Sequence, residues 1–258
     1  MLAALRGCSR RIAALAILAA APGSLLSWQA SASTSDAGKV EAGKVIDTAK
    51  EIEPPPPTQR TLWSEHFTGP VDWGDPQGHD ATELARVYNV QRTQGASFLH
   101  AHHDASQKSP PAAFHFGKTF GKKAGIPLEK VRAFRWRWRA HAQPAVQGDP
   151  WEDMALGIYV VTRTPSLFSS GRGFKFGWLA KPGRAGTHQR GLLQVPVRSD
   201  APSDEWKTET VDLCALYRRE FGDCEGERIL YIGVVTDADG TKSVADGDYT
   251  DFELLGDP

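Results

Sequence analysis

Arginine and aromatic residues alternate in the stretch RAFRWRWRA, residues 132–140. Successive side chains of an extended strand point to opposite faces, so Phe134, Trp136 and Trp138 share one face. The residues of the other face are Arg135, Arg137 and Arg139. The planar donor fork of a guanidinium binds sugar hydroxyls or carboxylates in pairs of hydrogen bonds. We therefore take the three arginines as candidate ligand-binding residues, with an acidic glycan favoured over a neutral one.

A structural role explains the same alternation. The aromatic face then belongs to a hydrophobic core, and the arginines form ion pairs with acidic residues of neighbouring strands. The last strand candidate, DYTDFELL, supplies Asp248, Asp251 and Glu253 for this purpose. The sequence favours these ion pairs and leaves a ligand beside them as the alternative.

Aromatic residues near glycine and proline form a second set of ligand-binding candidates. Trp73, Trp151 and Trp178 all lie in or beside such stretches, where we expect loops. A loop tryptophan stacks on a sugar ring, but it equally well closes the end of a sandwich. Tyr159 completes the set, and the basic, glycine-rich segment 171–190 suits a mobile loop over a binding face.

Carboxylates are concentrated in the segment TDADGTKSVADGDYTD near the end of the chain. Asp237, Asp239 and Asp251 could act as hard oxygen ligands for calcium, and Glu65 with Asp251 gives a second arrangement. The spacing does not match a helix–loop–helix calcium site. Ordinary turn formation explains Asp237-Ala238-Asp239-Gly240 equally well, so calcium is an open expectation.

Histidines are concentrated in the segment LHAHHD. His100, His102 and Asp104 lie at every second position, so two imidazoles and a carboxylate share one strand face. A metal would need a further ligand from elsewhere in the chain. The histidines that could supply it are His66, His79 and His115. No other motif supports such a site, and solvated surface histidines are the favoured interpretation.

Motifs of the common hydrolases and nucleotide-binding enzymes are absent from the sequence. It has no Gly-x-Ser-x-Gly, no phosphate-binding loop and no Cys-x-x-Cys. A glycosidase needs two carboxyl groups about 5–10 Å apart, and Asp149, Asp153 and Asp251 are the candidates. Acidic residues are plentiful in the chain, so these three are weak catalytic candidates and a non-enzymatic function is favoured.

These residues need a β-sheet framework to position them. From Leu62 onward, short runs with period-two alternation are separated by glycine and proline, which predicts an antiparallel, jelly-roll-like β-sandwich. ELARVYNVQR and ASFLHAHHD are two of the expected strands, and the final strand is expected beside the first. One short helix is predicted in TVDLCALYRREFG, capped by Asp212 and ended by Gly222.

The first 60 residues differ in kind from the rest of the 258-residue chain. Residues 1–32 have arginines, then an apolar run, then Ala30-Ser31-Ala32, which predicts a cleaved signal peptide and export to the periplasm or beyond. The apolar run is too short for a membrane span, so we expect no transmembrane segment in the mature chain. Residues 33–60 are predicted to be a disordered linker that ends in four prolines, and residues 61–258 a single domain.

Charge argues against a nucleic-acid partner. The signal peptide contains three arginines and no acid, and its removal leaves 27 basic against 31 acidic residues. A nucleic-acid-binding protein usually has a strongly basic surface, which this balance does not predict.

Two cysteines remain after the signal peptide, Cys214 and Cys224. In an oxidising compartment such an isolated pair predicts a disulfide, which contributes about 2–3 kcal/mol by closing a short loop. The predicted helix carries the chain away from Cys214. The bridge therefore requires a sharp reversal at Gly222-Asp223.

Four blocks in the folded part resemble the bacterial domain-of-unknown-function family 3047. They are FRWRWRA, QGDPWEDMALGIYVV, EWKTETVDLCALYRREFG and IGVVTDADGTKSVADGDYTDFEL, and the resemblance covers residues 98–254. It implies a jelly-roll sandwich of the galactose-binding-like kind and no established activity. Matching positions are Trp136 to Arg139, Gly148, Asp149, Thr236, Asp237, Asp239, Tyr249 and Asp251. Pro150 replaces the second acid of the family's turn and puts any site there in doubt.

Taken together, the sequence predicts an exported, non-catalytic module that binds a glycan or another ligand of the cell envelope. One alternative is a glycan hydrolase or lyase, which requires two carboxylates facing one another across a cleft. The other is a structural or protein-interaction domain, which requires an exposed apolar patch and no pocket at the arginines. The oligomeric state is left open.

Overall fold

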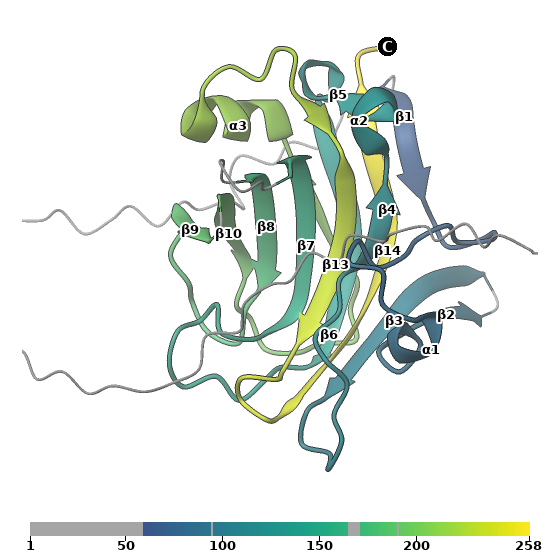
Figure 1. The fold of residues 1–258 in the computed structure, drawn as a ribbon, viewed down its shortest axis with the longest axis vertical. Coiled ribbons are helices and arrows are strands. Elements are labelled where there is room, and N and C mark those ends of the chain that lie inside the picture. The colour runs from purple at the N-terminus through teal and green to yellow at the C-terminus, as the bar shows by residue number, and fades with distance from the viewer. Residues whose placement is uncertain (1–58, 94, 165–170, 190) are drawn as a thin grey trace, which may run out of the picture. The chain divides into compact units, whose positions relative to one another are not determined.

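The computed structural model describes residues 59–93, 95–164, 171–189 and 191–258 (Figure 1). The predicted signal peptide (1–32) and all but the last two residues of the predicted linker (33–60) lie outside the described residues. About 47% of the described residues are in β-strands and 11% in helices, and the sheets do not close into a barrel. The prediction of an all-β sandwich is therefore confirmed.

The first sheet, called sheet A, has six strands. Five are ordered β11-β6-β14-β3-β2, and β1 also pairs with β14. Their bounds are β1 (Arg60–Glu65), β2 (Tyr88–Thr93), β3 (Ala96–Asp104), β6 (Ala133–Ala142), β11 (Lys207–Val211) and β14 (Val244–Gly256). The antiparallel pairing of β1 with β14 places the first strand beside the last, as expected.

The second sheet, called sheet B, also has six strands, ordered β4-β13-β7-β8-β10-β9. Their bounds are β4 (Phe116–Thr119), β7 (Met154–Arg163), β8 (Arg172–Trp178), β9 (Thr187–Gln189), β10 (Leu192–Arg198) and β13 (Tyr231–Asp237). One pair departs from the antiparallel expectation, because β10 runs parallel to β8. A parallel pair needs a long connection, which segment 179–191 provides. A separate two-stranded pair joins β5 (Ile126–Pro127) to β12 (Arg228–Ile229).

Helices are short and lie outside the sheets. They are α1 (Ala81–Leu84), α2 (Gly121–Ala124), the 3₁₀ turn η2 (Leu128–Lys130) and α3 (Leu213–Phe221). The predicted α3 is confirmed, since Asp212 accepts a hydrogen bond from the Ala215 N–H at 2.9 Å and Gly222 ends the helix with φ 96°. None of the described helices has the length and apolar character that crossing a membrane requires.

Helix α1 corrects one strand prediction. ELARVYNVQR was expected to be a strand throughout, but its first residues belong to α1 and only Tyr88 to Arg92 belong to β2. Asp80 starts the helix by accepting a hydrogen bond from the Thr82 N–H at 2.6 Å. A capping side chain of this kind satisfies a free N–H in the first turn of a helix. The cap at Asp80 therefore starts a helix at residues where the period-two pattern predicted a strand.

The core fills the space between the sheets with aromatic side chains. Phe134, Trp136 and Trp138 of β6 have no exposed surface. The Trp136 ring lies 5.4 Å from Phe176 of sheet B, and the Trp138 ring lies 5.7 Å from Trp178. The aromatic side of the 132–140 stretch therefore faces the core, as predicted, and the arginine side faces outward.

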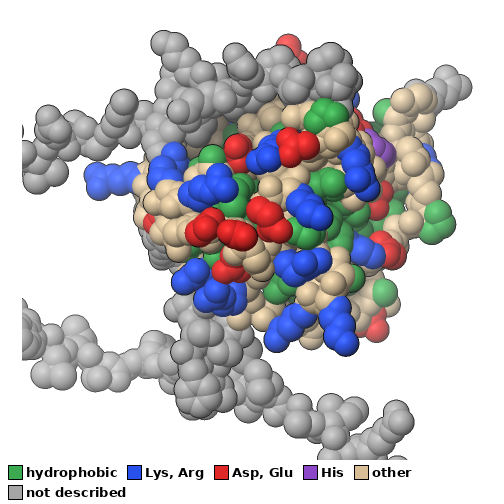
Figure 2. Space-filling model, turned by 90° about the horizontal axis from the view of Figure 1, so that it is seen from above, with side chains coloured by type: hydrophobic (Ala, Val, Ile, Leu, Met, Phe, Trp, Pro, Cys, Tyr) green, Lys and Arg blue, Asp and Glu red, His purple; other side chains and the backbone are tan. Residues whose placement is uncertain are grey.

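The predicted disulfide joins Cys214 to Cys224, with Cα atoms 5.7 Å apart. The chain reverses at Gly222, whose positive φ favours glycine. The bridge thus ties the first turn of α3 to the segment that follows it. Figure 2 views the molecule from the end where β5, α2 and α3 lie, and there basic side chains are interspersed with acidic and hydrophobic ones.

Candidate functional site

The outer face of sheet A carries a row of arginines on β6 opposite a row of acids on β14. Arg139 pairs in register with Asp248, and Arg135 with Glu253. The Arg139 Nε–H donates to Asp248 at 2.7 Å, and the Arg135 Nε–H donates to Glu253 at 2.6 Å. We call this surface the charged face. It comprises Arg135, Arg137, Arg139 and His141 on β6, Asp246, Asp248, Asp251 and Glu253 on β14, and His100 and His102 on β3.

Asp248 is the most buried carboxylate of the charged face, with 1% of its side chain exposed. It accepts hydrogen bonds from Arg139, from His100 Nδ1 at 2.8 Å and from His141 Nε2 at 2.9 Å. Burial alone would raise the pKa of Asp248, but these three hydrogen bonds outweigh it and lower the pKa. Asp248 is therefore an anion that holds three donors in place.

Histidines on β3 complete this network. The hydrogen bond to Asp248 raises the pKa of His100, against the opposing effect of its partial burial. His102 Nδ1 lies 2.7 Å from Asp246, and the His100 and His102 rings stack 6.4 Å apart. Both imidazoles therefore have carboxylate partners on β14. Among the described residues neither histidine belongs to a cluster of three or more possible metal ligands, and the preference for a non-metal role stays a prediction.

A β-bulge brings Asp251 onto the charged face. The register between β14 and β6 shifts between Thr250 and Glu253, and Asp251 has φ 51°, a left-handed conformation that costs a non-glycine residue about 1–2 kcal/mol. The bulge aims the Asp251 carboxylate at Arg137, whose Nη1 donates at 3.1 Å, and at His66 Nδ1, 2.8 Å away. Bulges often re-aim a side chain at a functional site.

A cavity of about 400 Å³ opens at this bulge. Its walls carry two guanidinium groups, two carboxylates, one imidazole and one hydroxyl. The residues are Arg135, Arg137, Asp251, Glu253, His66 and Thr208. Strands β1, β6, β11 and β14 or the residues next to them contribute, so neighbouring strands of sheet A together form the site.

Aromatic rings flank the middle of the charged face. The Arg139 guanidinium lies 4.6 Å from the Trp206 ring centre and 5.2 Å from that of Phe98, and Arg137 lies 5.4 Å from Trp206. A planar guanidinium stacks well on such rings. Trp206 is half-buried, so part of its indole borders the solvent beside the arginines.

The three tryptophans expected in or beside loops are buried, and of these Trp73 and Trp151 lie outside the strands whereas Trp178 ends β8. Trp178 has no exposed surface because it ends β8 and packs in the core, where its Nε1–H donates to the Asp200 carbonyl at 3.1 Å. Trp73 is 8% and Trp151 6% exposed. Their burial favours the alternative interpretation, in which these tryptophans pack into the sandwich instead of stacking on a sugar.

Tyr159 of β7 and Trp151, in the turn before β7, lie on sheet B rather than on the charged face. Both pack in a small apolar cluster with Tyr231 and Leu179. The Lys175 ammonium lies 5.8 Å from the Trp151 ring and 5.6 Å from the Tyr159 ring. Burial lowers the pKa of Lys175 to about 8, although nearby aspartates oppose the shift. The predicted ligand-binding set therefore separates into arginines on one sheet and aromatic residues on the other.

The four predicted calcium ligands do not form one cluster. Asp237 and Asp239 lie with Asp153, and one oxygen from each falls within 4.8 Å of the others. Asp251 points instead to Arg137, and Glu65 accepts a hydrogen bond from the Phe67 N–H at 2.6 Å. Burial, with added repulsion from Asp239 and Asp153, raises the pKa of Asp237 to about 7. Calcium remains a prediction, now with Asp153 in place of Asp251 and Glu65.

The three weak catalytic candidates have different hydrogen-bond partners. Asp153 is fully buried and anchors the 240–241 turn, accepting hydrogen bonds from Gly240 N–H at 3.1 Å and Thr241 N–H at 2.7 Å. Asp149 is exposed and accepts from the Trp151 N–H at 3.0 Å. Asp251 has a second carboxylate beside it, Glu253, but both accept hydrogen bonds from arginine.

Three residues of the site escaped the sequence prediction or were given other roles. His141 continues the two-residue period of the arginines, so the alternation alone could have found it. Trp206, which immediately precedes β11, lies two residues before Thr208 and so follows the same period. His66 was considered only as a distant metal ligand, and no local pattern predicts its contact with Asp251.

No protein-family model and no curated protein matches the chain, so the resemblance to family 3047 stays a prediction.

Proposed function

We propose that this protein is a binding module for a neutral oligosaccharide or a similar polyhydroxylated ligand, bound at the charged face. The observation that carries the proposal is the cavity beside Asp251, in which Arg135 and Arg137 stand among two carboxylates, an imidazole and a hydroxyl. A sugar hydroxyl both donates and accepts hydrogen bonds. A wall that alternates fixed donors with fixed acceptors is complementary to a row of such hydroxyls.

Charge balance favours a neutral ligand. The cavity holds two guanidinium groups and two carboxylates, so their formal charges cancel while His66 is neutral. An unpaired arginine ladder would favour an acidic glycan, but Arg137 and Asp251 already neutralise one another. A uronate would have to compete with Asp251 and Glu253 for the same donors.

The arrangement favours binding over catalysis. A glycosidase uses one carboxyl group that keeps its proton for the leaving group. In the cavity Glu253 accepts a hydrogen bond from Arg135 and Asp251 accepts one from Arg137, so both carboxylates already hold arginine donors. The pair Asp251 and Glu253, with His66 beside both, supports hydrolysis as the second candidate function. A pure interaction domain is less favoured because the arginines line a pocket.

An exported location completes the proposal. The disulfide between Cys214 and Cys224 suits an oxidising compartment, and the first 32 residues have the composition of a signal peptide. We place the module in the periplasm or outside the cell, where envelope polysaccharides would supply its ligand.

Calorimetric titration against matched oligosaccharides tests the proposal. A neutral series of gluco-, manno- and galacto-oligosaccharides is compared with uronate oligomers of the same length. We expect saturable binding of at least one neutral series and weaker binding of every uronate series. Preference for a uronate would contradict the charge argument. Release of reducing ends from the panel would favour the hydrolase instead.

A further inference from the structure

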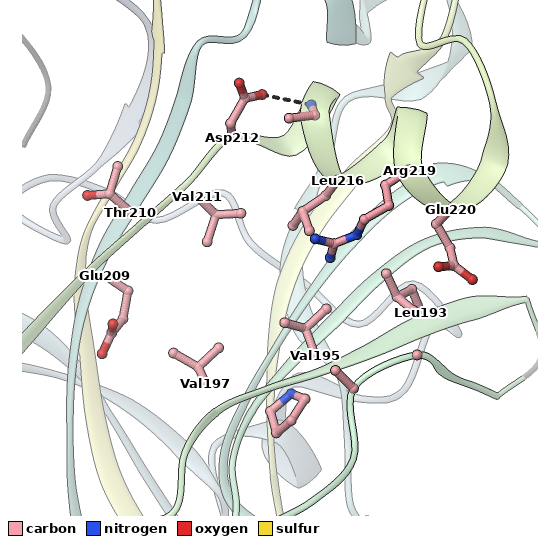
Figure 3. Close-up of a pocket in the computed structure, with 14 residues that line it drawn as sticks. Leu193, Val195, Val197, Glu209, Thr210, Val211, Asp212, Leu216, Arg219 and Glu220 are labelled. Atoms are coloured by element: carbon pink, nitrogen blue, oxygen red, sulfur yellow. Dashed lines mark hydrogen bonds between the residues drawn. The ribbon is translucent and has the colours of Figure 1, made fainter. Parts of the chain in front are cut away.

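A second cavity, of about 440 Å³, lies between the edges of the two sheets (Figure 3). Strand β10 of sheet B forms one wall, and β11 of sheet A forms another. Helix α3 contributes the third side. The aliphatic side chains that line it are Leu193, Val195, Val197, Val211 and Leu216, with Pro196 and Ala215 beside them. The volume lies within the range of small-ligand pockets.

The cavity continues the hydrophobic core to the surface. Leu193 and Val195 are buried members of the core. Val197, Val211 and Leu216 pack against that core but are only partly buried. The described strands leave this edge uncovered, and aliphatic surface lines the cavity between β10 and β11. Covering such surface with an alkyl chain is favourable in proportion to the area removed from water.

Among the described residues that line this apolar cavity, Arg219 is the one cation. The Arg219 guanidinium points into it, toward Leu216, from the last turn of α3 (Figure 3). Within the described part of the chain, Arg219 forms no ion pair and its side chain donates no hydrogen bond. It therefore retains donors for a ligand.

The acids around the cavity have other partners. Glu209 pairs with Arg198 and accepts from the Trp138 indole at 3.1 Å. Asp212 caps α3 at the Ala215 N–H. Glu220 also has an interaction of its own. A single anionic group on a ligand would thus meet an available guanidinium at Arg219 rather than a neutralised one.

We propose that this cavity binds the alkyl chain of an aliphatic monocarboxylate, with the carboxylate held by Arg219. The aliphatic walls match the chain, and the guanidinium fork matches the two carboxylate oxygens. A phosphate monoester carries more negative charge than one guanidinium balances, and Asp212 and Glu220 nearby disfavour the excess. This cavity shares no residue with the charged face, so its test is independent of the test of the proposed function.

The direct test is calorimetry with hexanoate, octanoate, decanoate and decanol, with the carboxylates below their micelle concentrations and decanol below its solubility limit. We expect affinity to rise about fourfold for each methylene group that the cavity covers. Decanol should bind about tenfold more weakly than decanoate, because a hydroxyl cannot form the charge-assisted pair of hydrogen bonds. Absence of decanoate binding, or affinity independent of chain length, would overturn the proposal.

Three variants locate the site. Arg219→Gln should weaken decanoate about tenfold and leave decanol unchanged, whereas Arg218→Gln, on the same helix turn but outside the cavity, should change neither. Ala215→Trp introduces a large ring at an exposed position of α3 that lines the cavity, so it should abolish binding while the fold survives. Circular dichroism checks folding of each variant. Full decanoate binding by folded Ala215→Trp, or equal losses in Arg218→Gln and Arg219→Gln, would show that the chain binds elsewhere.

Discussion

Asp248 Oδ2 accepts a hydrogen bond from Arg139 Nε at 2.7 Å across the paired strands β14 and β6. Their neighbours in register, Tyr249 and Trp138, point to the opposite side and are fully buried in the core. One pair of strands thus holds an aromatic layer inside and an ion-pair network outside. The network fixes the guanidinium groups in place before any ligand arrives, which reduces the entropy lost on binding.

Removing the charge of Asp248 should destabilise the fold. In Asp248→Asn, Arg139 loses its buried anion and the two histidines lose theirs, so we expect the free energy of unfolding to fall by about 2–4 kcal/mol. Urea denaturation measures the change. Asp204→Asn is the matched control, because Asp204 also contacts His141, at 2.9 Å, but is 92% exposed. Its effect should stay within about 0.5 kcal/mol, and equal effects of the two variants would contradict the account.

His100 should make stability depend on pH. Its pKa is raised in the folded protein by Asp248, so its contribution is complete below the unfolded pKa of 6.5 and is lost as pH rises through the folded pKa. Asp246, Asp248 and Arg139 are the charged groups that face it. The difference in unfolding free energy between wild type and His100→Gln should therefore be larger at pH 6 than at pH 9. A difference that does not change with pH, or that grows toward pH 9, would refute this assignment.

The ionised carboxylate of Asp237 should lower the free energy of unfolding. Its pKa is raised from 3.8 to about 7 in the folded protein, so the stability it contributes in acid is lost as pH rises through that interval. Asp237→Asn should remove this loss and raise the free energy of unfolding at pH 8 by about 1 kcal/mol or more, since one pKa unit corresponds to about 1.4 kcal/mol. Thermal denaturation with a chelator present measures it. A less stable variant at pH 8 would mean that Asp237 is needed as an anion.

The disulfide should hold α3 in place over the apolar cavity. Replacing both cysteines, in Cys214→Ala with Cys224→Ala, should lower the free energy of unfolding by about 2–3 kcal/mol, because the closed loop spans a sequence separation of only 10 residues. Decanoate binding should weaken with it, since Ala215, Leu216 and Arg219 all lie on that helix. A reductant should reproduce both effects in the wild type and change neither in the double variant.

The inward and outward faces of β6 could be predicted from the sequence because strand geometry fixes the two-residue period. The side chains of Trp136 and Arg137, as neighbours in a strand, therefore had to point to opposite faces of the sheet in any β-fold. The acidic partners were also predictable, since the closing strand offered Asp248 and Glu253 at the same period. What the period could not predict is the bulge at Asp251, which inserts an extra residue and depends on the pairing of β14 with β6.

Trp178 shows why one loop prediction failed. Gly177 suggested a turn, but it lies within β8, where the ring of Trp151 covers it. A Cβ at position 177 would lie 2.9 Å from a ring carbon of Trp151. The glycine therefore marks a close approach between segments distant in sequence rather than a turn. The position of Asp153 beside Asp237 likewise depends on the turn at Gly240 and Thr241, and no local signal reveals it.

The most direct test of the account is calorimetric titration of the best neutral oligosaccharide against Arg137→Ala and Arg163→Ala. The two arginines are similarly exposed, at 40% and 44%, and each pairs with one acid, but Arg163 belongs to sheet B and lies outside the cavity. Urea denaturation of both variants confirms that they remain folded. The account predicts that Arg137→Ala weakens binding at least tenfold and that Arg163→Ala leaves it unchanged. Unchanged binding in a folded Arg137→Ala variant would contradict the charged face as the ligand site.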